Sequence, residues 1–131
     1  MLSLNILRKC FVELERCNLF SDKEIKVFLK GQAKDTYEKL EQDNNKYAKT
    51  LLNSINRAII ILKENPQYGQ PIAKQLIPEK YLKEGIKNLY RIELSNFWRL
   101  LYTIEGSKIE IFLFILDIHD HKGYNKLFGY K

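Results

Sequence analysis

A nearly unbroken apolar run late in the chain constrains the fold more than any other feature of the sequence. Residues 109–116 are Ile-Glu-Ile-Phe-Leu-Phe-Ile-Leu, a composition typical of a central strand that is covered on both faces. Two more strand-like runs precede it, and only short turns such as Ser95-Asn96 and Glu105-Gly106-Ser107 separate the three. Connections this short force neighbouring strands to pair antiparallel, as a meander. The predicted strands are Asn88–Leu94, Phe97–Ile104 and Lys108–Leu116.

The residues before the meander predict helices and one strand. Apolar side chains recur there at three- and four-residue steps in three segments and alternate with polar ones in a fourth. All three prolines fall between Asn65 and Gly85, so this stretch is expected to be an irregular loop with one short helical turn. The predicted elements are a helix over Leu2–Cys17, a strand over Ile25–Leu29 and two adjacent helices over Gln32–Gln42 and Lys46–Glu64.

Length and charge narrow the class of protein. A chain of 131 residues suits one hydrophobic core, so we expect a single domain over residues 1–131. The 22 Lys and Arg against 16 Asp and Glu give a formal net charge of +6, which favours nucleic acid or an acidic protein as partner.

Cysteines and hydropathy suggest a reduced, cytoplasmic setting. Cys10 and Cys17 would lie about two helical turns apart, roughly 10 Å, too far for a disulfide. Without a nearby histidine cluster they do not make a closed zinc site either. No stretch approaches the roughly 20 apolar residues of a membrane span, and no signal peptide is recognisable, so we expect no membrane partner.

The order of these elements resembles the RelE/ParE superfamily of toxins, over residues 24–131. Leu89–Leu94 is similar to that family's Tyr-Arg/Lys-Ile strand, and Phe97–Tyr102 to its aromatic-Arg-hydrophobic-hydrophobic-Tyr strand. An apolar strand follows, and then His119 with Tyr124 five residues later, which matches the family's His-to-Tyr spacing. The resemblance implies an α+β, RelE-like fold: an antiparallel meander sheet packed against a helical pair. The N-terminal helix, within residues 1–20, is an extension outside the usual family core.

The resemblance also implies a function. It suggests the toxin of a type II toxin–antitoxin system, an endoribonuclease that cuts ribosome-bound mRNA by attack of a ribose 2′-hydroxyl, without metal or cofactor. The implied partners are a cognate antitoxin, mRNA on the ribosome, and operator DNA reached through the antitoxin. Two alternatives stay open: a ParE-like toxin that inhibits a topoisomerase without cutting RNA, and a degenerate member that only binds its antitoxin. The presence of His119 and Tyr124 argues against the ParE-like alternative.

Cleavage of this kind needs a base for the 2′-hydroxyl, a cation for the phosphorus centre and an acid for the leaving oxygen. Arg91 and Arg99 are expected to grip the phosphate, and His119 to transfer protons. Tyr124 is expected to stack on a base or polarise the 2′-hydroxyl. Glu93 stands where ribosome-dependent relatives often have a lysine, although a carboxylate can act as base, as in the YoeB-like branch.

Each of these residues also has a structural interpretation. Arg91 could pair with Glu93, Arg99 could lie on a solvated strand face, and His119 could belong to a surface turn. Asp117 and Asp120, which alternate with the two histidines, could orient the imidazole rings. A metal site at these residues would need a third ligand from elsewhere in the chain. Further cationic side chains are expected to track the RNA backbone. They are Lys74, Lys80, Lys83, Lys87, His121, Lys122 and Lys126.

Overall fold

The computed structural model describes residues 24–106 and 110–129, which form a mixed α+β fold around a five-stranded sheet. The helix predicted over Leu2–Cys17, both cysteines and Tyr130 lie outside the described residues. The elements, in chain order, are β1 (Glu24–Leu29), α3 (Gly31–Gln42), α4 (Lys46–Glu64), β2 (Gln70–Pro71), η1 (Lys74–Leu76), α5 (Glu79–Lys83), β3 (Tyr90–Glu93), η2 (Ser95–Phe97), β4 (Arg99–Gly106), β5 (Glu110–His119) and α6 (His121–Phe128).

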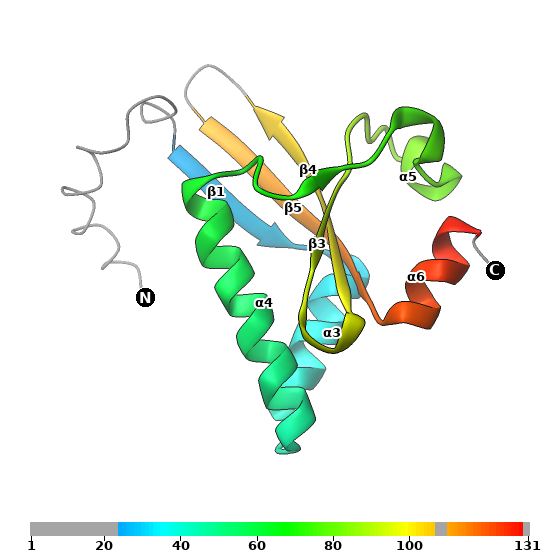
Figure 1. Ribbon diagram of the computed structural model, residues 1–131. Coiled ribbons are helices and arrows are strands. Elements are labelled where there is room, and N and C mark those ends of the chain that lie inside the picture. Colours follow the sequence, from blue (N-terminus) through cyan, green and yellow to red (C-terminus); the bar gives the residue numbers. More distant parts are fainter. Residues whose placement is uncertain (1–23, 107–109, 130–131) are drawn as a thin grey trace.

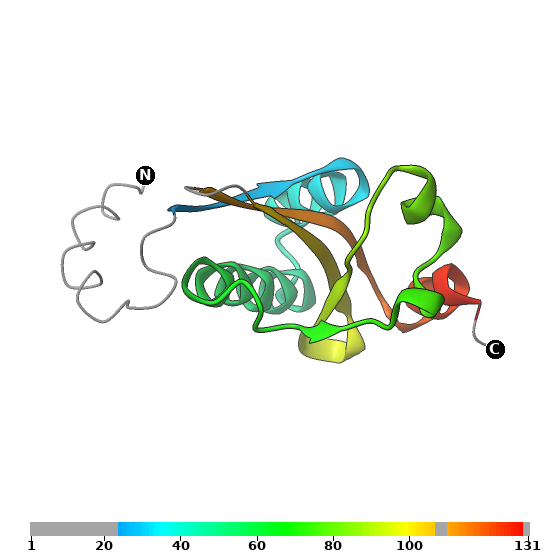
Figure 2. The same ribbon diagram turned by 90° about the horizontal axis from the view of Figure 1, so that it is seen from above.

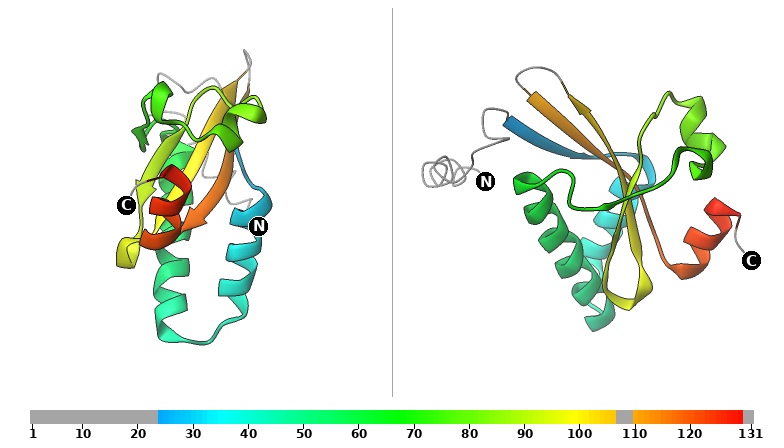
Figure 3. Two further views of the ribbon diagram at one scale, coloured as in Figure 1. Left: turned by 90° about the vertical axis from the view of Figure 1, so that its right-hand side faces the viewer. Right: turned by 45° about the horizontal axis from the view of Figure 1, so that its top comes forward.

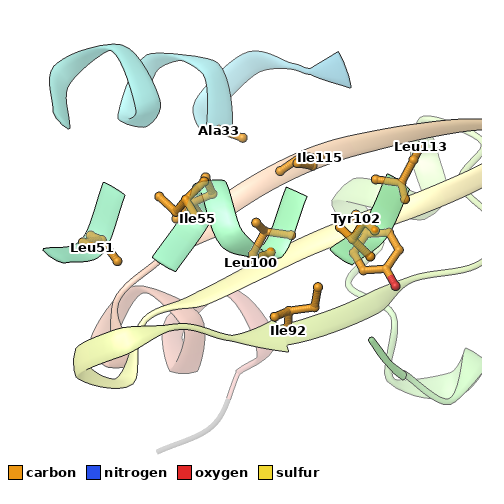
Figure 4. Close-up of a cluster of buried hydrophobic side chains, with 11 residues drawn as sticks. Ala33, Leu51, Ile55, Ile92, Leu100, Tyr102, Leu113 and Ile115 are labelled. Atoms are coloured by element: carbon orange, nitrogen blue, oxygen red, sulfur yellow. The ribbon is translucent and has the colours of Figure 1, made fainter. Parts of the chain in front are cut away.

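Two groups of helices lie on opposite sides of the curved sheet (Figures 1 and 2). The long helices α3 and α4 cover one face, which we call the helix-pair face, and α5 and α6 cover part of the other, the site face. The helix pair buries the main core, which Figure 4 shows in close-up. Its central members are Ala33, Leu51, Ile55, Ile92, Leu100, Tyr102, Leu113 and Ile115. A smaller cluster under α5 and α6 contains Ile77, Tyr81, Leu89, Leu101 and Tyr124.

The strand order is β1-β5-β4-β3-β2. β3, β4 and β5 pair antiparallel in sequence order, whereas β1 pairs parallel with β5. The apolar run is therefore a central strand, with a neighbour on each edge, as predicted. Covering of both faces is only partial, because Phe28 is 42% exposed and lies against Phe112 and Phe114 on the site face. Neither α5 nor α6 extends over this end of the sheet (Figure 1).

A β-bulge interrupts the pairing of β4 with β5. Tyr102 pairs with Ile115, but the preceding Leu101 pairs with Asp117, so that Leu116 is an extra residue in β5. Strict alternation would place Asp117 and His119 on the same face as Ile115, toward the helix pair. The extra residue reverses the faces, and Ile118 joins the main core instead. Asp117 and His119 are thereby turned to the site face.

Several predicted strand limits were wrong. β4 begins at Arg99, later than expected, because Ser95–Phe97 forms a tight turn. β3 begins at Tyr90, later than the expected Asn88, whose side-chain amide bonds the backbone of Ile104. β5 continues to His119 and does not end at Leu116, so His119 is not in a loop after the last strand. The buried Asp117 has polar partners that let the strand continue past it. The proline-rich loop also contributes the short strand β2, which was not predicted.

The turn between β3 and β4 has an unusual backbone. Trp98 N donates to Ser95 O at 3.2 Å, and the two residues between them, Asn96 and Phe97, have φ of 55° and 65°. Two successive left-handed residues define a type I′ hairpin turn, in which Asn is common at the first position and Gly at the second. Phe97 therefore occupies a position that suits glycine, at a cost of roughly 1–2 kcal/mol.

Candidate active site

Three charged or titratable side chains lie side by side across the site face of the sheet. Glu93 on β3 pairs with Arg99 on β4, and Arg99 pairs with His119 on β5. Residues directly opposite one another on paired strands share a face, so these three form one row. The next row contains Arg91, Leu101 and Asp117. The sheet therefore brings together Arg91, Arg99 and His119, as the hypothesis of a shared site requires.

Helix α6 packs on the site face of the sheet and carries Tyr124. Asp120 caps this helix, since its Oδ1 accepts a hydrogen bond from Gly123 N at 2.8 Å. The hydroxyl of Tyr124 accepts a hydrogen bond from Arg91 Nη1 at 3.1 Å. The guanidinium carbon of Arg99 lies 4.8 Å from the centre of the Tyr124 ring, within cation–π distance. Tyr124 thus contacts both arginines.

Burial limits what Tyr124 can do. Its side chain is only 4% exposed, and its ring stacks on Phe128 with the ring centres 4.5 Å apart. A ring covered in this way is not open to stack on a base. Its contacts with Arg91 and Arg99 favour a role that differs from the two expected ones, in which Tyr124 holds the two guanidiniums in position.

The alternative partners of the arginines are partly present. Arg91 Nη2 donates to Gln70 Oε1, a residue that sequence analysis did not single out, and lies 3.9 Å from Glu93 Oε2, a long ion pair. Arg99 Nη1 donates to the carbonyl of Phe97 at 3.2 Å. Within the described residues, the buried Nε of Arg91 and that of Arg99 have no hydrogen-bond acceptor. Their donor capacity is therefore not used up by the fold.

His119 and Asp117 form a polar pair on β5. His119 Nε2 lies 3.6 Å from Asp117 Oδ1, so Asp117 is placed to orient the ring, as the sequence suggested. Asp117 also accepts a hydrogen bond from the hydroxyl of Tyr81 and pairs with Lys80 Nζ at 3.2 Å. Burial by itself raises the pKa of Asp117, but the nearby His119 ring, the hydrogen bond from Tyr81 and the charge of Lys80 outweigh it and lower the pKa below its usual value.

Tyr81 is the member of this cluster that sequence analysis missed. It lies on α5 within the proline-rich stretch, where no periodic pattern marks a buried residue. Burial, together with the hydrogen bond to the Asp117 carboxylate, raises the pKa of Tyr81 far above its usual value. The Tyr81 hydroxyl therefore keeps its proton and donates it in the hydrogen bond to Asp117. The only sequence signal was an aspartate inside an apolar run, which requires a buried partner.

The first turn of α6 packs tightly on His119. A Cβ added to Gly123 would lie 3.0 Å from His119 Nδ1 and 3.2 Å from its Cβ. One ring nitrogen of His119 therefore faces Asp117, and the other faces the one residue of α6 that has no side chain. Asp120, the second aspartate expected to orient a ring, caps the helix.

The cationic residues expected to track RNA are spread around the site face. Lys80 forms an ion pair with Asp117. His121, Lys122 and Lys126 lie on the exposed side of α6, where His121 Nε2 is 3.2 Å from Asn125 Nδ2. The other three, Lys74, Lys83 and Lys87, are exposed in and around η1 and α5.

Next to Asp117, on the side away from His119, the surface has a hollow of about 410 Å³. Lys30, Lys80, Thr103, Phe114 and Asp117 are among its lining residues.

In residues 24–106 and 110–129, no three His, Cys, Asp or Glu side chains gather as a metal site requires. Over the same ranges, no helix combines the length and apolar character needed to cross a bilayer.

The comparisons with known proteins agree with this architecture. No protein-family model matches the chain, and no curated protein sequence does. Among solved structures, the fold has a similar counterpart. One similar structure is a YoeB/ParE toxin from Agrobacterium tumefaciens, which superposes with a TM-score of 0.53 at 17% sequence identity. The match covers 73% of this chain and 98% of that toxin. The fold expected from the sequence is thus found in a protein of the class that the sequence resembles.

Proposed function

We propose that this protein is the toxin of a type II toxin–antitoxin pair and that it cleaves mRNA held by the ribosome. The observation that carries the proposal is the row formed by Glu93, Arg99 and His119, with Arg91 in the adjacent row. The net charge of +6 supports a polyanionic substrate. The fold shared with a YoeB/ParE toxin supports the toxin class. In this proposal residues 24–131 are the toxin core of a single domain.

The row suggests how the reaction proceeds. The carboxylate of Glu93 takes the proton of the ribose 2′-hydroxyl, and the 2′ oxygen forms a bond to phosphorus. The bond from phosphorus to the 5′ oxygen then breaks, and His119 gives a proton to that oxygen after its ring turns away from Asp117, which frees Nε2. The products are a 2′,3′-cyclic phosphate and a 5′-hydroxyl. Two strand spacings put the Cα atoms of Glu93 and His119 about 10 Å apart, so that acid and base flank one phosphate.

The arginines supply the positive charge. Arg99, in the middle of the row, lies where charge builds up on the five-coordinate phosphorus. Arg91 is held by Tyr124 and Gln70, which leaves its guanidinium beside the same position. Tyr124 thus acts by fixing both guanidiniums. None of these steps requires a metal ion or a cofactor.

The partners follow from the same proposal. We expect a cognate antitoxin with a segment that folds on binding and covers the basic site face, and contact with operator DNA through that antitoxin. Lys74, Lys83, Lys87, His121, Lys122 and Lys126 contact the RNA backbone. The site of action is the cytoplasm.

Single-turnover cleavage of ribosome-bound mRNA tests the proposal. We expect Arg99→Ala to slow cleavage by about 10²–10³ and His119→Ala by about 10²–10⁴. The matched control is Arg57→Ala, which removes an exposed arginine from α4 in the opposite layer and should cleave at the wild-type rate. Equal rates for wild type, Arg99→Ala and His119→Ala would refute the site.

The alternative functions predict different outcomes. A ParE-like toxin would arrest growth and inhibit a topoisomerase in a DNA supercoiling assay while leaving RNA intact. A chain retained only to bind its antitoxin would not arrest growth when expressed alone. Growth arrest together with fragments that end in a 2′,3′-cyclic phosphate is the result that our proposal requires.

A further inference from the structure

The turn between β3 and β4 presents an aromatic side chain that the fold does not use. Phe97 has a left-handed backbone at the position where a type I′ turn favours glycine. Its side chain is 75% exposed, the highest value among the exposed large hydrophobic residues of the described chain. The next residue, Trp98, packs against the main core and donates its Nε1 hydrogen to Tyr47. Phe97 therefore combines backbone strain with almost no burial.

A strained backbone and an exposed ring both lower the stability of the fold, so the presence of phenylalanine at this position needs an explanation other than stability. Glycine would relieve the backbone strain, and a polar residue would suit the exposure. Residues that lower stability in this way concentrate at functional sites. Phe97 is therefore a candidate contact for a ligand.

The position of Phe97 indicates which ligand. Its carbonyl accepts the hydrogen bond from Arg99 Nη1, so the turn is joined directly to the guanidinium in the centre of the row. Figures 1 and 3 show the turn beside the start of α6, which bears Tyr124. Tyr124 is covered and contacts Arg99 from within. Phe97 is the exposed aromatic residue next to the same arginine.

We propose that Phe97 stacks on an unpaired base of the RNA whose phosphate Arg99 holds, an inference that depends on the proposed function. Phe97 combines an exposed ring with a backbone carbonyl that binds the Arg99 guanidinium. A cation that neutralises phosphate and a nearby exposed ring that stacks on a base together bind single-stranded nucleic acid. Stacking accepts any base, so Phe97 contributes affinity without sequence preference. In this proposal Phe97, and not Tyr124 as expected from the sequence, stacks on the base.

The test measures equilibrium binding of a short, fluorescent single-stranded RNA whose 2′-hydroxyls are methylated, so that it binds without being cut. We expect Phe97→Gly to weaken binding by about 5- to 150-fold and Phe97→Tyr to retain wild-type affinity. Urea unfolding should show Phe97→Gly to be at least as stable as wild type, because glycine suits the turn. The control is Ile60→Ala, an exposed apolar residue of α4, which should bind normally.

The outcomes separate this inference from the proposed function. No binding of the RNA by wild type, either free in solution or held by the ribosome, would refute the RNA-directed function itself. Tight binding by wild type and equally tight binding by Phe97→Gly would overturn only the stacking role, and would assign the exposed ring to a protein partner. Reduced stability of Phe97→Gly would also overturn the inference, because the ring would then serve the fold.

Discussion

At the scale of single residues, Asp117 connects the stability of the fold to the candidate site. It is 2% exposed, yet its pKa lies below the usual value because His119, Tyr81 and Lys80 stabilise the carboxylate. The unfolded chain therefore binds the Asp117 proton more readily than the folded one does. The stability that Asp117 contributes is complete above the ordinary carboxyl pKa near 4 and is lost as the pH falls through the lower pKa of the folded state.

We expect Asp117→Asn to show this dependence. The variant should be less stable than wild type by about 1–3 kcal/mol at pH 7, because Tyr81 and Lys80 lose a charged acceptor. The difference should begin to shrink below about pH 4, where the unfolded chain binds the proton, and should be lost as the pH falls through the lower pKa of folded Asp117. Urea unfolding at several pH values measures it, with Asp35→Asn, an exposed aspartate of α3, as the control. Parallel loss of stability by wild type and Asp117→Asn on acidification would contradict the assignment.

At the scale of elements, α6 must lie close against β5 for Tyr124 and His119 to share the site. Gly123 permits this approach, since any side chain there would press on His119. A helix of eight residues gains little stability from its own hydrogen bonds. The Asp120 cap and the contacts of Tyr124 with the sheet therefore hold it in place.

The substitution Gly123→Ala separates helix propensity from site geometry. Alanine favours the helix by about 0.8–1 kcal/mol, while crowding against His119 opposes it, so we expect a free energy of unfolding within about 1 kcal/mol of wild type. Cleavage should fall roughly 10- to 100-fold, because the ring is displaced. Gly106→Ala is the matched control, since the nearest atom to its added methyl among the described residues, chain neighbours apart, is 3.7 Å away. Full cleavage by Gly123→Ala would show that the close packing is not needed.

Helices and strands could be predicted where the spacing of apolar residues is regular, and features were missed where that spacing is irregular. Alternation and apolar spacing located β1, α3, α4 and the three meander strands β3, β4 and β5, within a few residues. The bulge at Leu116 leaves no local signal, because an apolar run looks the same with or without an extra residue. Sequence alone could therefore name His119 as a candidate but could not say which face it takes. Gln70 and Tyr81 were missed because they reach the site from an irregular segment.

At the scale of the whole molecule, charge placement matters more than the total charge of +6. Lys122 and Lys126 are exposed on α6, beside the candidate site, whereas Lys49 and Lys63 are exposed on α4 in the opposite layer. Either pair changed to alanine lowers the net charge from +6 by two, to +4. Only the first pair lies on the face expected to meet RNA.

We therefore expect the two double variants to differ in salt dependence. Each contact between a lysine and a phosphate adds roughly 0.7 to the slope of log affinity against log salt for a single strand. Lys122→Ala with Lys126→Ala should reduce the slope by about 1–1.4, and Lys49→Ala with Lys63→Ala should leave it unchanged. Titration of the methylated RNA at several salt concentrations gives both slopes. Equal slopes for the two double variants would mean that RNA does not cross α6.

The parallel pairing of β1 with β5 has a consequence for a chain still on its ribosome. Glu24–Leu29 finds its partner only when Glu110–Ile115 has been synthesised, and His119 and α6 come later still. Pairing between segments so far apart in sequence is slow and late in folding. A nascent chain thus carries both arginines before it carries His119, and we expect it to lack the proposed cleavage activity until β5 has been made and has paired with β1.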